Sequence, residues 1–473
     1  MPNKPPPYTD FSELFVGLEN KVPLLNGSQR RYYNFDNSAS TPPLKSVQAA
    51  INQFAEYYSS VHRGTGYKSQ ISTHLYEEAR RIVMEFFGAH PDEHVCIFGK
   101  NTTEAINKLA RRYPFTPEKN IVITSGMEHH SNDLPWRAHA NAVHVRLHPD
   151  GRLDLEDFDT QLEKHADRIA LVAISGASNV TGFLNPIHDL AEKAHAVGAQ
   201  IFVDCAQLAP HRSVDMLPLA DPRHLDYIAI SAHKLYAPYG TGALIGRRDT
   251  FERGEPDMVG GGVVEIVTLD SVEWAEPPDR DEAGSPNSIG VVALAVAIKQ
   301  LDKIGMQNVA AHEIELTQYA LENLPEVPGI TLLSDPDPNN TENRLGVIPF
   351  NLTNIDHFKA AAVLGYEFGI GVRNGCFCAH PLILHILGLS DQESEKVRTD
   401  IINHDKSHMP GLIRASFGLY NSTEEIDVLI EALTAISRGS FEGNYIQDKP
   451  TGEYSPENWN PEFDKYVSLS LED

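Results

Sequence analysis

The sequence contains little cysteine, with only four among 473 residues. That number is too small for a disulfide framework and is typical of a reducing compartment. No stretch of about 18 apolar residues runs free of charge, so no segment has the pattern of a membrane-spanning helix. The opening residues, MPNKPPPYTD, also lack the basic and apolar segments of a signal peptide. From these absences we expect a globular, cytoplasmic protein.

Basic residues are also few, since 39 lysines and arginines stand against 65 aspartates and glutamates and give a net charge of −26. No run of lysine or arginine offers a surface for a phosphate backbone, so we expect neither a nucleic-acid nor a membrane partner. The length exceeds what one hydrophobic core usually supports, which predicts two or three domains.

Short apolar runs alternate with amphipathic stretches between about residues 75 and 300. The runs are rich in β-branched residues and have no polar face, which is typical of strands buried on both sides. The amphipathic stretches at 103–113 and 187–199 predict helices, the second ending near Gly198. This alternation predicts an α/β fold with a mainly parallel sheet and helices on both faces. The runs are VCIFG (95–99), NIVITSG (120–126), IALVAIS (169–175), QIFVD (200–204) and DYIAIS (226–231).

The pattern changes after Ser285. Helical patterns at 287–305, 310–324 and 423–439, with a strand-like run at 344–352, predict a smaller α+β domain. The tail from Phe441 shows no clear period. We therefore divide the chain into an N-terminal segment packing on the small domain (1–32), a large domain (33–300), a small C-terminal domain (301–440) and a C-terminal tail (441–473).

Polar side chains follow the five predicted strands at their carboxyl ends, where open parallel sheets bind ligands. A helix that opens with hydroxyls and free backbone N–H groups can hold a phosphate, although such hydroxyls also serve as ordinary N-caps. In strand order the side chains are Thr102 and Thr103, then a histidine pair that includes His129, then Asn179, then Asp204 and Gln207, and finally Ser231, His233 and Lys234.

Pyridoxal phosphate is the cofactor that needs such groups together. It requires a lysine for the Schiff base, a carboxylate that keeps the pyridine nitrogen protonated, and a phosphate cradle. Lys234 alone could be a solvated strand end. Asp204 alone could be a helix N-cap, but a carboxylate ending an apolar strand is costly unless a cation offsets it. Their combination favours the cofactor.

A series of motifs occurs in order between Tyr33 and Leu429: YYNFDNSAST, SSVHRGTGYKSQIST, MEHHSNDLPW, SNVTGFLNP, VDCAQLAPH, SAHKLYAPYGTGAL, EAGSPNS, RNGCFCAHP and IRASFGLYN. On these motifs the sequence resembles the class V aminotransferase-fold enzymes, and among them the SUF-type cysteine desulfurases and selenocysteine lyases. The resemblance implies the fold type I architecture of pyridoxal-phosphate-dependent transferases, with a seven-stranded type of sheet in the large domain.

The resemblance also implies a role for each polar residue. Lys234 would form the Schiff base, Asp204 would pair with the pyridine nitrogen, and His129 would stack over the ring and assist catalysis. Arg414 would bind the substrate carboxylate through its planar, two-pronged guanidinium. The other implied contacts are Gln207 and Asn179 with the phenolic oxygen, Asn179 also with the substrate, Thr102, Thr103, Ser231 and His233 with the phosphate, and Ser285 with the phosphate of a neighbouring subunit, which implies a homodimer.

The stretch RNGCFCAHP (373–381) places Cys376 and Cys378 two positions apart. His380 and His385 lie close by, but the spacing matches none of the usual structural zinc patterns, and we expect no metal. A disulfide across one residue would be strained and would not persist in a reducing compartment. The remaining interpretation is a nucleophile, and the resemblance selects Cys378.

We therefore expect an enzyme that converts L-cysteine to L-alanine, with the sulfur carried as a persulfide on Cys378 and passed to an acceptor protein. Selenocysteine or a cysteine derivative stays open as the substrate. One alternative is a C–S lyase, which would not need Cys378 and would release pyruvate and ammonia. Another is a non-catalytic scaffold that holds sulfur-transfer partners on its acidic surface.

The segment at 389–411, between Cys378 and Arg414, is longer than in the SUF-type relatives. Its polar character is typical either of a solvated surface excursion or of a helical element that closes the site or docks an acceptor. Cys376 stands where the relatives commonly have a histidine, and its role is open between a sulfur relay, a redox switch and no function.

Overall fold

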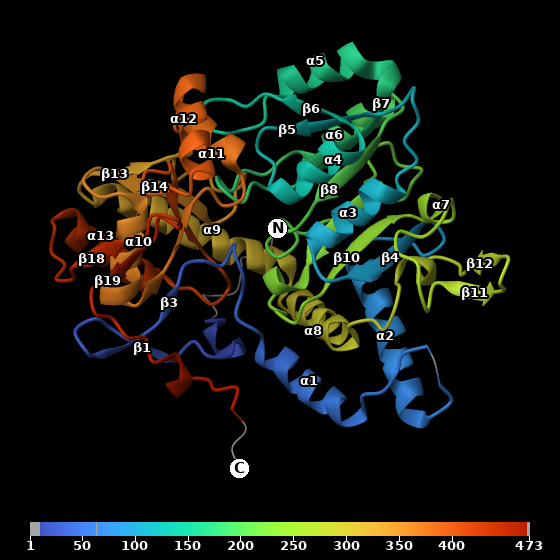
Figure 1. The fold of residues 1–473 in the computed structure, drawn as a ribbon, viewed down its shortest axis with the longest axis horizontal. Coiled ribbons are helices and arrows are strands. Elements are labelled where there is room, and N and C mark those ends of the chain that lie inside the picture. The colour runs from blue at the N-terminus through green and yellow to red at the C-terminus, as the bar shows by residue number, and fades with distance from the viewer. Residues whose placement is uncertain (1–9, 63, 471–473) are drawn as a thin grey trace, which may run out of the picture.

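A seven-stranded sheet forms the centre of the larger of two lobes (Figure 1). The computed structural model describes residues 10–62 and 64–470. The strand order is β4-β10-β9-β8-β7-β5-β6, and β10 runs antiparallel to the other six strands. The mainly parallel α/β fold is thereby confirmed. The strands are β4 (His94–Gly99), β5 (Ile121–Ser125), β6 (Asn141–Val145), β7 (Ile169–Ser175), β8 (Gln200–Asp204), β9 (Tyr227–Ser231) and β10 (Gly242–Arg247).

The five predicted strands are all present and buried on both faces. In β7, Val172 and Ile174 join one apolar cluster, whereas Leu171 and Ala173 join the cluster on the opposite face. Strands β6 and β10 were not predicted from the sequence, for different reasons. β6 is an edge strand with mostly unburied residues. In β10 the apolar run of the sequence is short because it ends at Gly246, which packs against a tyrosine ring.

Helices cover both faces of this sheet. Gly198 follows α6 with a φ of 72°, the left-handed conformation that ends helices, as the sequence predicted. The helices α3 (Thr102–Arg112) and α4 (Leu134–His139) contribute to the cluster on one face, together with the short α7 (Arg248–Phe251). The other cluster takes side chains from α1 (Lys45–Tyr57), α2 (Tyr67–Phe86), α5 (Leu155–His165), α6 (Ile187–Ala196) and α8 (Ser288–Ile304).

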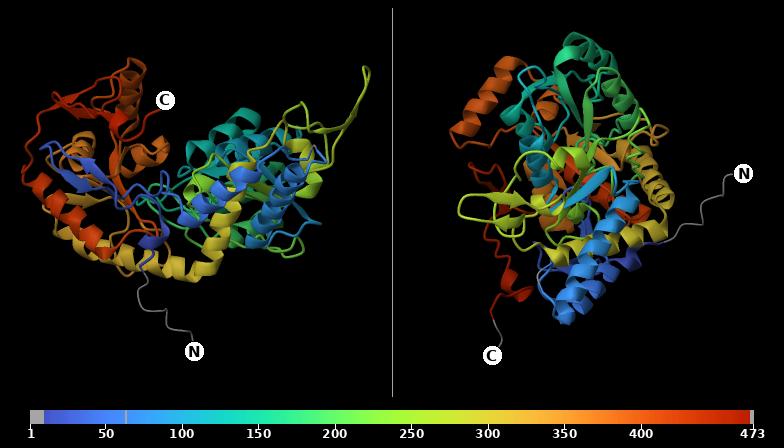
Figure 2. Two further views of the ribbon diagram at one scale, coloured as in Figure 1. Left: turned by 90° about the horizontal axis from the view of Figure 1, so that it is seen from below. Right: turned by 90° about the vertical axis from the view of Figure 1, so that its right-hand side faces the viewer.

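The smaller lobe contains a four-stranded antiparallel sheet of order β13-β14-β17-β16. Its core joins Phe350 and Ile413 of the sheet to Leu364 and Leu429 of the covering helices. In Figure 2 the long helices α8 and α9 run along one side of both lobes. The elements are β13 (Ile330–Leu332), β14 (Val347–Leu352), β16 (Arg373–Gly375), β17 (Leu412–Ser416), α9 (Met306–Asn323), α10 (His357–Phe368) and α13 (Thr423–Ser437).

The N-terminal segment lies along the smaller lobe. Strands β1 (Lys21–Pro23) and β2 (Gln29–Arg31) form a hairpin, and β3 (Tyr33–Asn34) pairs with β15 (Ile370–Gly371). Asp36 then bridges to Ser416 of β17. The chain therefore contacts the smaller lobe for a few residues beyond position 32, so the division placed there stays a proposal.

The segment at 389–411 contains the helix α12 (Asp391–Ile402), which follows α11 (His380–Ile386). A capping box between Ser390 and Glu393 starts α12, and none of its side chains is buried. This fits a solvated surface excursion, and a docking role for α12 stays a prediction. Across residues 10–62 and 64–470, no helix combines the length and apolar character needed to cross a bilayer.

Two further hairpins extend the lobes. The hairpin of β11 (Val264–Val267) and β12 (Val272–Trp274) projects from the larger lobe (Figure 1). In the tail, β18 (Tyr445–Gln447) pairs with β19 (Tyr454–Pro456) and packs on α10. The tail thus gains its order from contacts with the smaller lobe, which explains why its sequence shows no period.

One carboxylate anchors the start of this tail. Glu367 of α10 accepts hydrogen bonds from the backbone N–H groups of Glu442 and Gly443 and from the Tyr445 hydroxyl, at 2.9, 3.0 and 2.8 Å. Because such charge-assisted bonds contribute about 1 to 3 kcal/mol each, we expect Glu367→Ala to release the tail from α10. Faster hydrogen exchange and proteolysis over residues 442–459 would register the release. Glu431→Ala, on the exposed face of α13, is the control, and equal exchange in both variants would contradict the assignment.

Candidate active site

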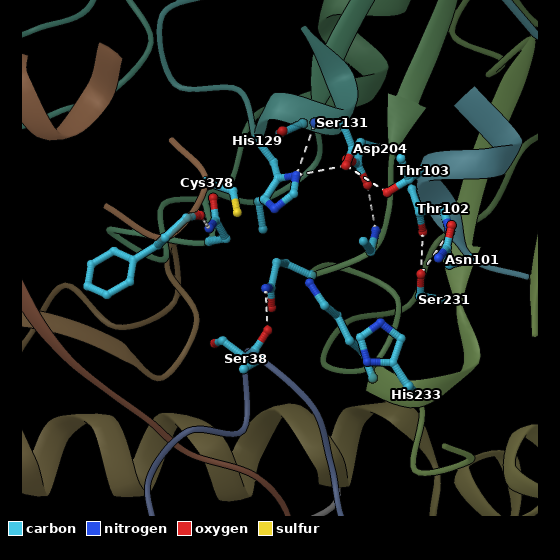
Figure 3. A pocket seen from close by; sticks show the side chains of 18 of the residues that line it. Ser38, Asn101, Thr102, Thr103, His129, Ser131, Asp204, Ser231, His233 and Cys378 are labelled. Carbon is cyan, nitrogen blue, oxygen red and sulfur yellow. Dashed lines mark hydrogen bonds between the residues drawn. The ribbon is translucent and has the colours of Figure 1, made fainter. Parts of the chain in front are cut away.

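A cavity of about 260 Å³ opens at the carboxyl ends of the central parallel strands (Figure 3). The smaller lobe contributes Arg373, Phe377, Cys378 and Arg414 to its wall. The larger lobe contributes most of the predicted residues, which are Thr102, Thr103, His129, Asn179, Asp204, Gln207, Ser231, His233 and Lys234. Residues that are scattered over more than 300 positions therefore face one space.

Lys234 and Asp204 lie at the floor of the cavity, at the ends of neighbouring strands. Burial lowers the pKa of Lys234 to about 8, although the Asp204 carboxylate acts in the opposite direction. Burial also raises the pKa of Asp204, against a hydrogen bond from the Ala206 N–H at 2.9 Å and the charge of Lys234. The pair thus places an amine of reduced basicity next to a carboxylate that has little solvent.

A polar cradle surrounds the first turn of α3. The Thr102 N–H donates to Ser231 Oγ at 2.9 Å, and the hydroxyls of the same two residues lie 2.8 Å apart. Thr103 Oγ1 is 2.7 Å from Ser131 Oγ, and Asn101 caps the helix by accepting from the Glu104 N–H. Hydroxyls grouped at a helix N-terminus suit an anion such as a phosphate.

His129 lies in the wall beside this cradle. Its Nδ1 accepts a hydrogen bond from the Ser131 N–H at 3.1 Å, so the neutral ring carries its hydrogen on Nε2. Burial, followed by the charge of Lys234, lowers the pKa of His129 to about 4. The ring is therefore neutral near pH 7 and can donate from Nε2. The same two causes lower the pKa of His233 to about 4.

Arg414 reaches the cavity from β17 and is buried. Its guanidinium donates to Asp36 Oδ1 at 3.0 Å and to the Asn179 carbonyl at 2.8 Å, and it lies 4.8 Å from the centre of the Phe377 ring. Within the described part of the chain, its Nε–H has no hydrogen-bond partner. A guanidinium held in this way at the wall of the cavity suits an incoming carboxylate.

Cys378 lies on the loop between β16 and α11 and is exposed, unlike Cys376. Phe377 and Cys378 both adopt positive φ values, 50° and 54°. Two contacts with the larger lobe hold these residues: Asn179 Nδ2 donates to the Phe377 carbonyl and the His130 N–H donates to the Cys378 carbonyl, both at 2.8 Å. The loop thus presents its thiol at the cavity from a backbone that is fixed on both sides.

Cys376 is buried and is not among the residues that line the cavity. Its Sγ donates to the Pro410 carbonyl at 3.2 Å, and burial raises its pKa to about 12. A thiol held in this form is a weak nucleophile.

Three predicted residues have other contacts in this structure. Gln207 Nε2 donates to the Ser38 carbonyl at 2.9 Å, and the amide of Asn179 is engaged by the Phe377 carbonyl. Ser285 does not line the cavity; it borders a separate hollow that also contains Lys100 and Asn287. The role predicted for Ser285, in a neighbouring subunit, stays a prediction.

Several residues that build the site had no role predicted from the sequence. Asp36 and Ser38 lie in YYNFDNSAST, and Glu128 lies in MEHHSNDLPW, so both motifs were visible but these side chains had no assigned contacts. Phe377 lies in RNGCFCAHP, but the sequence did not indicate its contact with the Arg414 guanidinium, because that contact depends on how two distant segments of the smaller lobe pack.

Glu128 is a buried carboxyl directly behind the cavity wall. Its oxygens accept from Ser125 Oγ at 2.6 Å, from Ser175 Oγ at 2.5 Å and from Asn132 Nδ2 at 2.7 Å. These bonds favour the ionised form, but burial outweighs them and raises the pKa of Glu128 to about 7. Since Ser175 also lines the cavity, Glu128 supports the wall from behind.

The fold and this site define a class of enzyme. The family model for class-V aminotransferases matches residues 33–429, which is most of the chain, and the protein belongs to this family.

Curated relatives support a narrower grouping. The chain is 34% identical over 409 residues to a protein of Haloferax volcanii named cysteine desulfurase, covering 85% of this chain and 88% of the relative. It is 35% identical over 424 residues to the cysteine desulfurase of Dickeya dadantii, covering 88% and 93%.

Solved structures give the same grouping. The apo structure of the cysteine desulfurase from Thermococcus onnurineus superposes with a TM-score of 0.75 at 32% identity, over 86% of this chain and 95% of the other. The cysteine desulfurase CsdA from Escherichia coli, solved as its S-sulfonic acid form, superposes with a TM-score of 0.72 at 26% identity, over 87% and 96%.

Glu128 generates a pH-dependent prediction. Because its folded pKa of about 7 exceeds the ordinary value of 4.5, its contribution to stability is complete below pH 4.5 and is lost as the pH rises through 7. Compared with Glu128→Gln, the wild type should therefore lose about 3 kcal/mol of unfolding free energy between these limits.

Denaturant unfolding at a series of pH values measures this difference. Replacement of the exposed Glu118 by glutamine is the control and should leave the wild-type profile unchanged. If the Glu128→Gln profile coincides with that of the wild type, the assigned pKa is wrong.

Proposed function

We propose that this protein is a pyridoxal-phosphate-dependent cysteine desulfurase, which removes the sulfur of L-cysteine and releases L-alanine. The observation that carries the proposal is the meeting of Lys234, Asp204 and the loop thiol of Cys378 at one cavity. The curated relatives that are named cysteine desulfurase support it. Selenocysteine stays open as a second substrate.

The residues of the cavity fit the cofactor. Lys234 would hold it covalently, Asp204 would face its ring nitrogen, and His129 would cover its ring. When bound, pyridoxal phosphate supplies an electron sink for the charge left on the substrate Cα. The remaining groups toward it would be Thr102, Thr103, Ser231 and His233 at the phosphate, Gln207 and Asn179 at the phenolic oxygen, and Ser285 of a neighbouring subunit.

Lys234 serves as the base that takes the Cα proton. Its pKa of about 8 leaves a useful fraction of the neutral amine near neutral pH, while the ammonium form is still accessible for returning a proton. His129, neutral and with its hydrogen on Nε2, can donate a hydrogen bond into the cavity.

Arg414 orients the substrate. Asp36 and the Asn179 carbonyl fix two of its nitrogens, so the planar guanidinium is held in place before the substrate arrives. The guanidinium lines the cavity and provides the donors for the carboxylate, and its buried position strengthens that contact.

Cys378 takes the sulfur. Its thiolate attacks the sulfur of the substrate, an S–S bond forms, and the substrate Cβ–S bond breaks with its electron pair left on the carbon skeleton. Protonation of that carbon gives alanine, and Cys378 is left as a persulfide. Because Cys378 is exposed, the sulfur can then pass to an acceptor protein.

The oligomeric state, the compartment and the acceptor protein follow from the same proposal. The contact expected of Ser285 requires a homodimer, and the four free cysteines suit a cytoplasmic, reducing compartment. The exposed helix α12 is the element that would dock the acceptor protein.

The test is incubation of the purified, cofactor-loaded protein with L-cysteine, with assays for alanine, pyruvate and a persulfide on Cys378. Alanine together with the persulfide supports the proposal. Pyruvate and ammonia would identify a C–S lyase instead. A protein that takes up no pyridoxal phosphate during loading, seen as no cofactor absorbance, and forms neither alanine nor pyruvate would be a scaffold.

Replacement of the nucleophile isolates its step. We expect Cys378→Ser to abolish the persulfide and to reduce alanine formation by about 100-fold or more, because the hydroxyl is a far weaker nucleophile than a thiolate, while the cofactor absorbance persists. Cys376→Ser is the matched control and should retain activity. Undiminished alanine production by Cys378→Ser would remove the nucleophile assignment.

Replacement of the substrate clamp changes a different parameter. Arg414→Lys keeps the charge but loses the planar two-pronged contact, so we expect KM for L-cysteine to rise by about 10-fold or more with a smaller change in kcat. Steady-state kinetics measure the two values. Arg398→Lys, on the exposed surface of α12, should change neither, and an unaltered KM in Arg414→Lys would exclude the carboxylate contact.

A further inference from the structure

A second histidine of the larger lobe contacts the loop that carries Cys378. His130 follows His129 in the sequence, and its N–H donates to the Cys378 carbonyl at 2.8 Å. Its ring makes two more contacts, both at Nε2: the His380 N–H donates to it at 3.3 Å, and His380 Nδ1 lies 3.1 Å away. His130 therefore holds the loop on both sides of Ala379, and neither ring contact was predicted from the sequence.

The backbone contact decides how the His130 ring is protonated. A backbone N–H can only donate, so Nε2 of His130 carries a lone pair and the hydrogen of the neutral ring is on Nδ1. His380 then carries a hydrogen on its own Nδ1 and donates it to the same lone pair. The two rings lie parallel, with an interplanar angle of 1°. Both ring contacts thus require a neutral His130.

The surroundings of His130 favour the neutral ring. Burial, followed by His380, lowers the pKa of His130; Arg137 acts in the same direction and Asp133 acts against it. Burial, followed by Lys406, also lowers the pKa of His380. Both rings are therefore neutral near pH 7, and the lone pair of His130 stays available to the loop.

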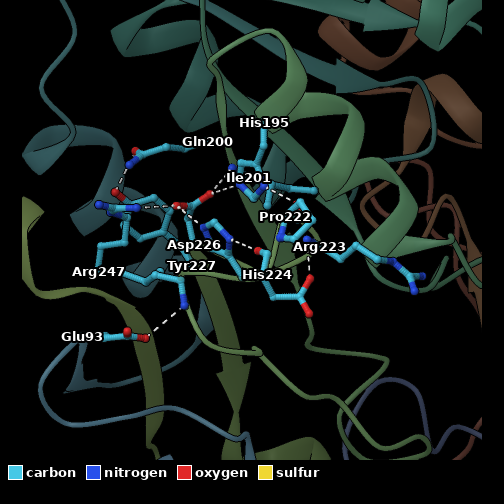
Figure 4. Close-up of polar contacts among 12 residues, drawn as sticks. Glu93, His195, Gln200, Ile201, Pro222, Arg223, His224, Asp226, Tyr227 and Arg247 are labelled. Atoms are coloured by element: carbon cyan, nitrogen blue, oxygen red, sulfur yellow. Dashed lines mark hydrogen bonds and ion pairs between the residues drawn. The ribbon is translucent and has the colours of Figure 1, made fainter.

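A second pair of histidines, at the end of the sheet opposite to the cavity, gives a contrast (Figure 4). His195 is stacked on His224; its Nε2 lies 2.9 Å from Asp226 Oδ2, and its Nδ1 lies 2.7 Å from the Pro222 carbonyl oxygen. Burial acts to lower the pKa of His195, but these two hydrogen bonds outweigh it and raise that pKa. Because both nitrogens face acceptors, His195 carries two hydrogens and a charge. A ring that accepts from a backbone N–H, as His130 does, has to stay neutral.

The loop of Cys378 needs a support of this kind. Phe377 and Cys378 are consecutive non-glycine residues with φ values of 50° and 54°, a conformation that is unfavourable for L-residues and persists only where contacts hold it. His380 is the first residue of α11, so its N–H has no acceptor within that helix. The His130 ring supplies the acceptor from the larger lobe.

We propose that His130 is a positioning residue for the nucleophile: its neutral imidazole caps α11 and fixes the loop so that the Cys378 thiol is presented at the cavity. This inference rests on the proposed function, in which that thiol attacks the sulfur of the substrate. His129 lines the cavity, whereas His130 is not among the residues of its wall. The two neighbouring histidines thus have different roles, since one ring faces the cavity and the other holds the loop.

Hydrogen exchange of the full-length, cofactor-loaded protein tests the positioning directly. His130→Ala removes the acceptor, so we expect the amides of residues 378–380 to exchange about 10-fold faster or more. His130→Gln places an amide oxygen near the position of Nε2 and should keep the exchange within about 2-fold of the wild type. His74→Ala, at an exposed histidine of α2, is the control and should leave the exchange unchanged.

Steady-state kinetics with L-cysteine test the consequence for catalysis. We expect His130→Ala to lower kcat for alanine formation by about 10-fold while KM changes little, because Arg414 still binds the substrate and only the thiol is displaced. His130→Gln should restore kcat. If the wild type itself forms no alanine, the proposed function fails, while the exchange experiment still tests the positioning.

The pH dependence of the wild type gives a test that needs no alanine variant. A proton added to Nε2 of His130 removes the acceptor, and burial places this event below the ordinary pKa of 6.5. The protection of the His380 amide should therefore fall as the pH falls below 6.5, whereas in His130→Gln it should stay constant, because an amide does not titrate. Protonation of His380 leaves its Nδ1–H in place and does not break the contact.

Three outcomes would overturn the inference. Equal exchange of residues 378–380 in the wild type and in His130→Ala would show that the ring does not hold the loop. Exchange in His130→Gln as fast as in His130→Ala would show that the volume of the ring matters and the acceptor does not. Protection of the His380 amide that is the same above and below pH 6.5 in the wild type would exclude the lone pair as its acceptor. Circular dichroism establishes that each variant is folded.

Discussion

The burial of Lys234 beside Asp204 is the interaction on which the site depends. Parallel strands β8 and β9 end side by side, so the two side chains that follow them meet at one edge of the sheet. Each charge alone would be costly at this depth, and each shifts the pKa of the other against the effect of burial. The rest of the structure encloses this pair: hydroxyls on one side, imidazoles on another, and the smaller lobe above.

The two lobes meet through polar contacts that are also parts of the site. Arg414 of the smaller lobe bonds to the Asn179 carbonyl of the larger one, and the Asn179 side chain holds the loop of Cys378 in return. The proposed substrate clamp and the proposed nucleophile are therefore positioned by the same residue. A change in how the lobes pack would displace both together and, under the proposed function, would disturb substrate orientation and sulfur transfer at the same time.

Much of the larger lobe could be predicted because its strands are buried on both faces. That burial requires uninterrupted apolar runs such as IALVAIS, which are easily distinguished from helices of period 3.6. Strand β6 was missed because its sequence, NAVHV, carries polar residues and is mostly unburied. Strand β10 was missed because its glycines are selected by close contacts, such as Gly246 against the Tyr227 ring. The tail hairpin escaped prediction because it is held by Glu367, a residue far away in the chain.

The sequence by itself determined the fold class, the family and the identity of most residues that line the cavity, because local periodicity and ordered motifs record which positions are buried and which end a strand. Only the tertiary structure decided the contacts between distant residues. It brought Asp36 to Arg414, gave the buried Glu128 its three donors, turned Cys376 toward a backbone carbonyl and left Cys378 exposed. It also gathered His195, His224 and Asp226. The physical reason is that desolvation and hydrogen bonding depend on which side chains share a volume, and that is settled only when the sheet and the two lobes have packed.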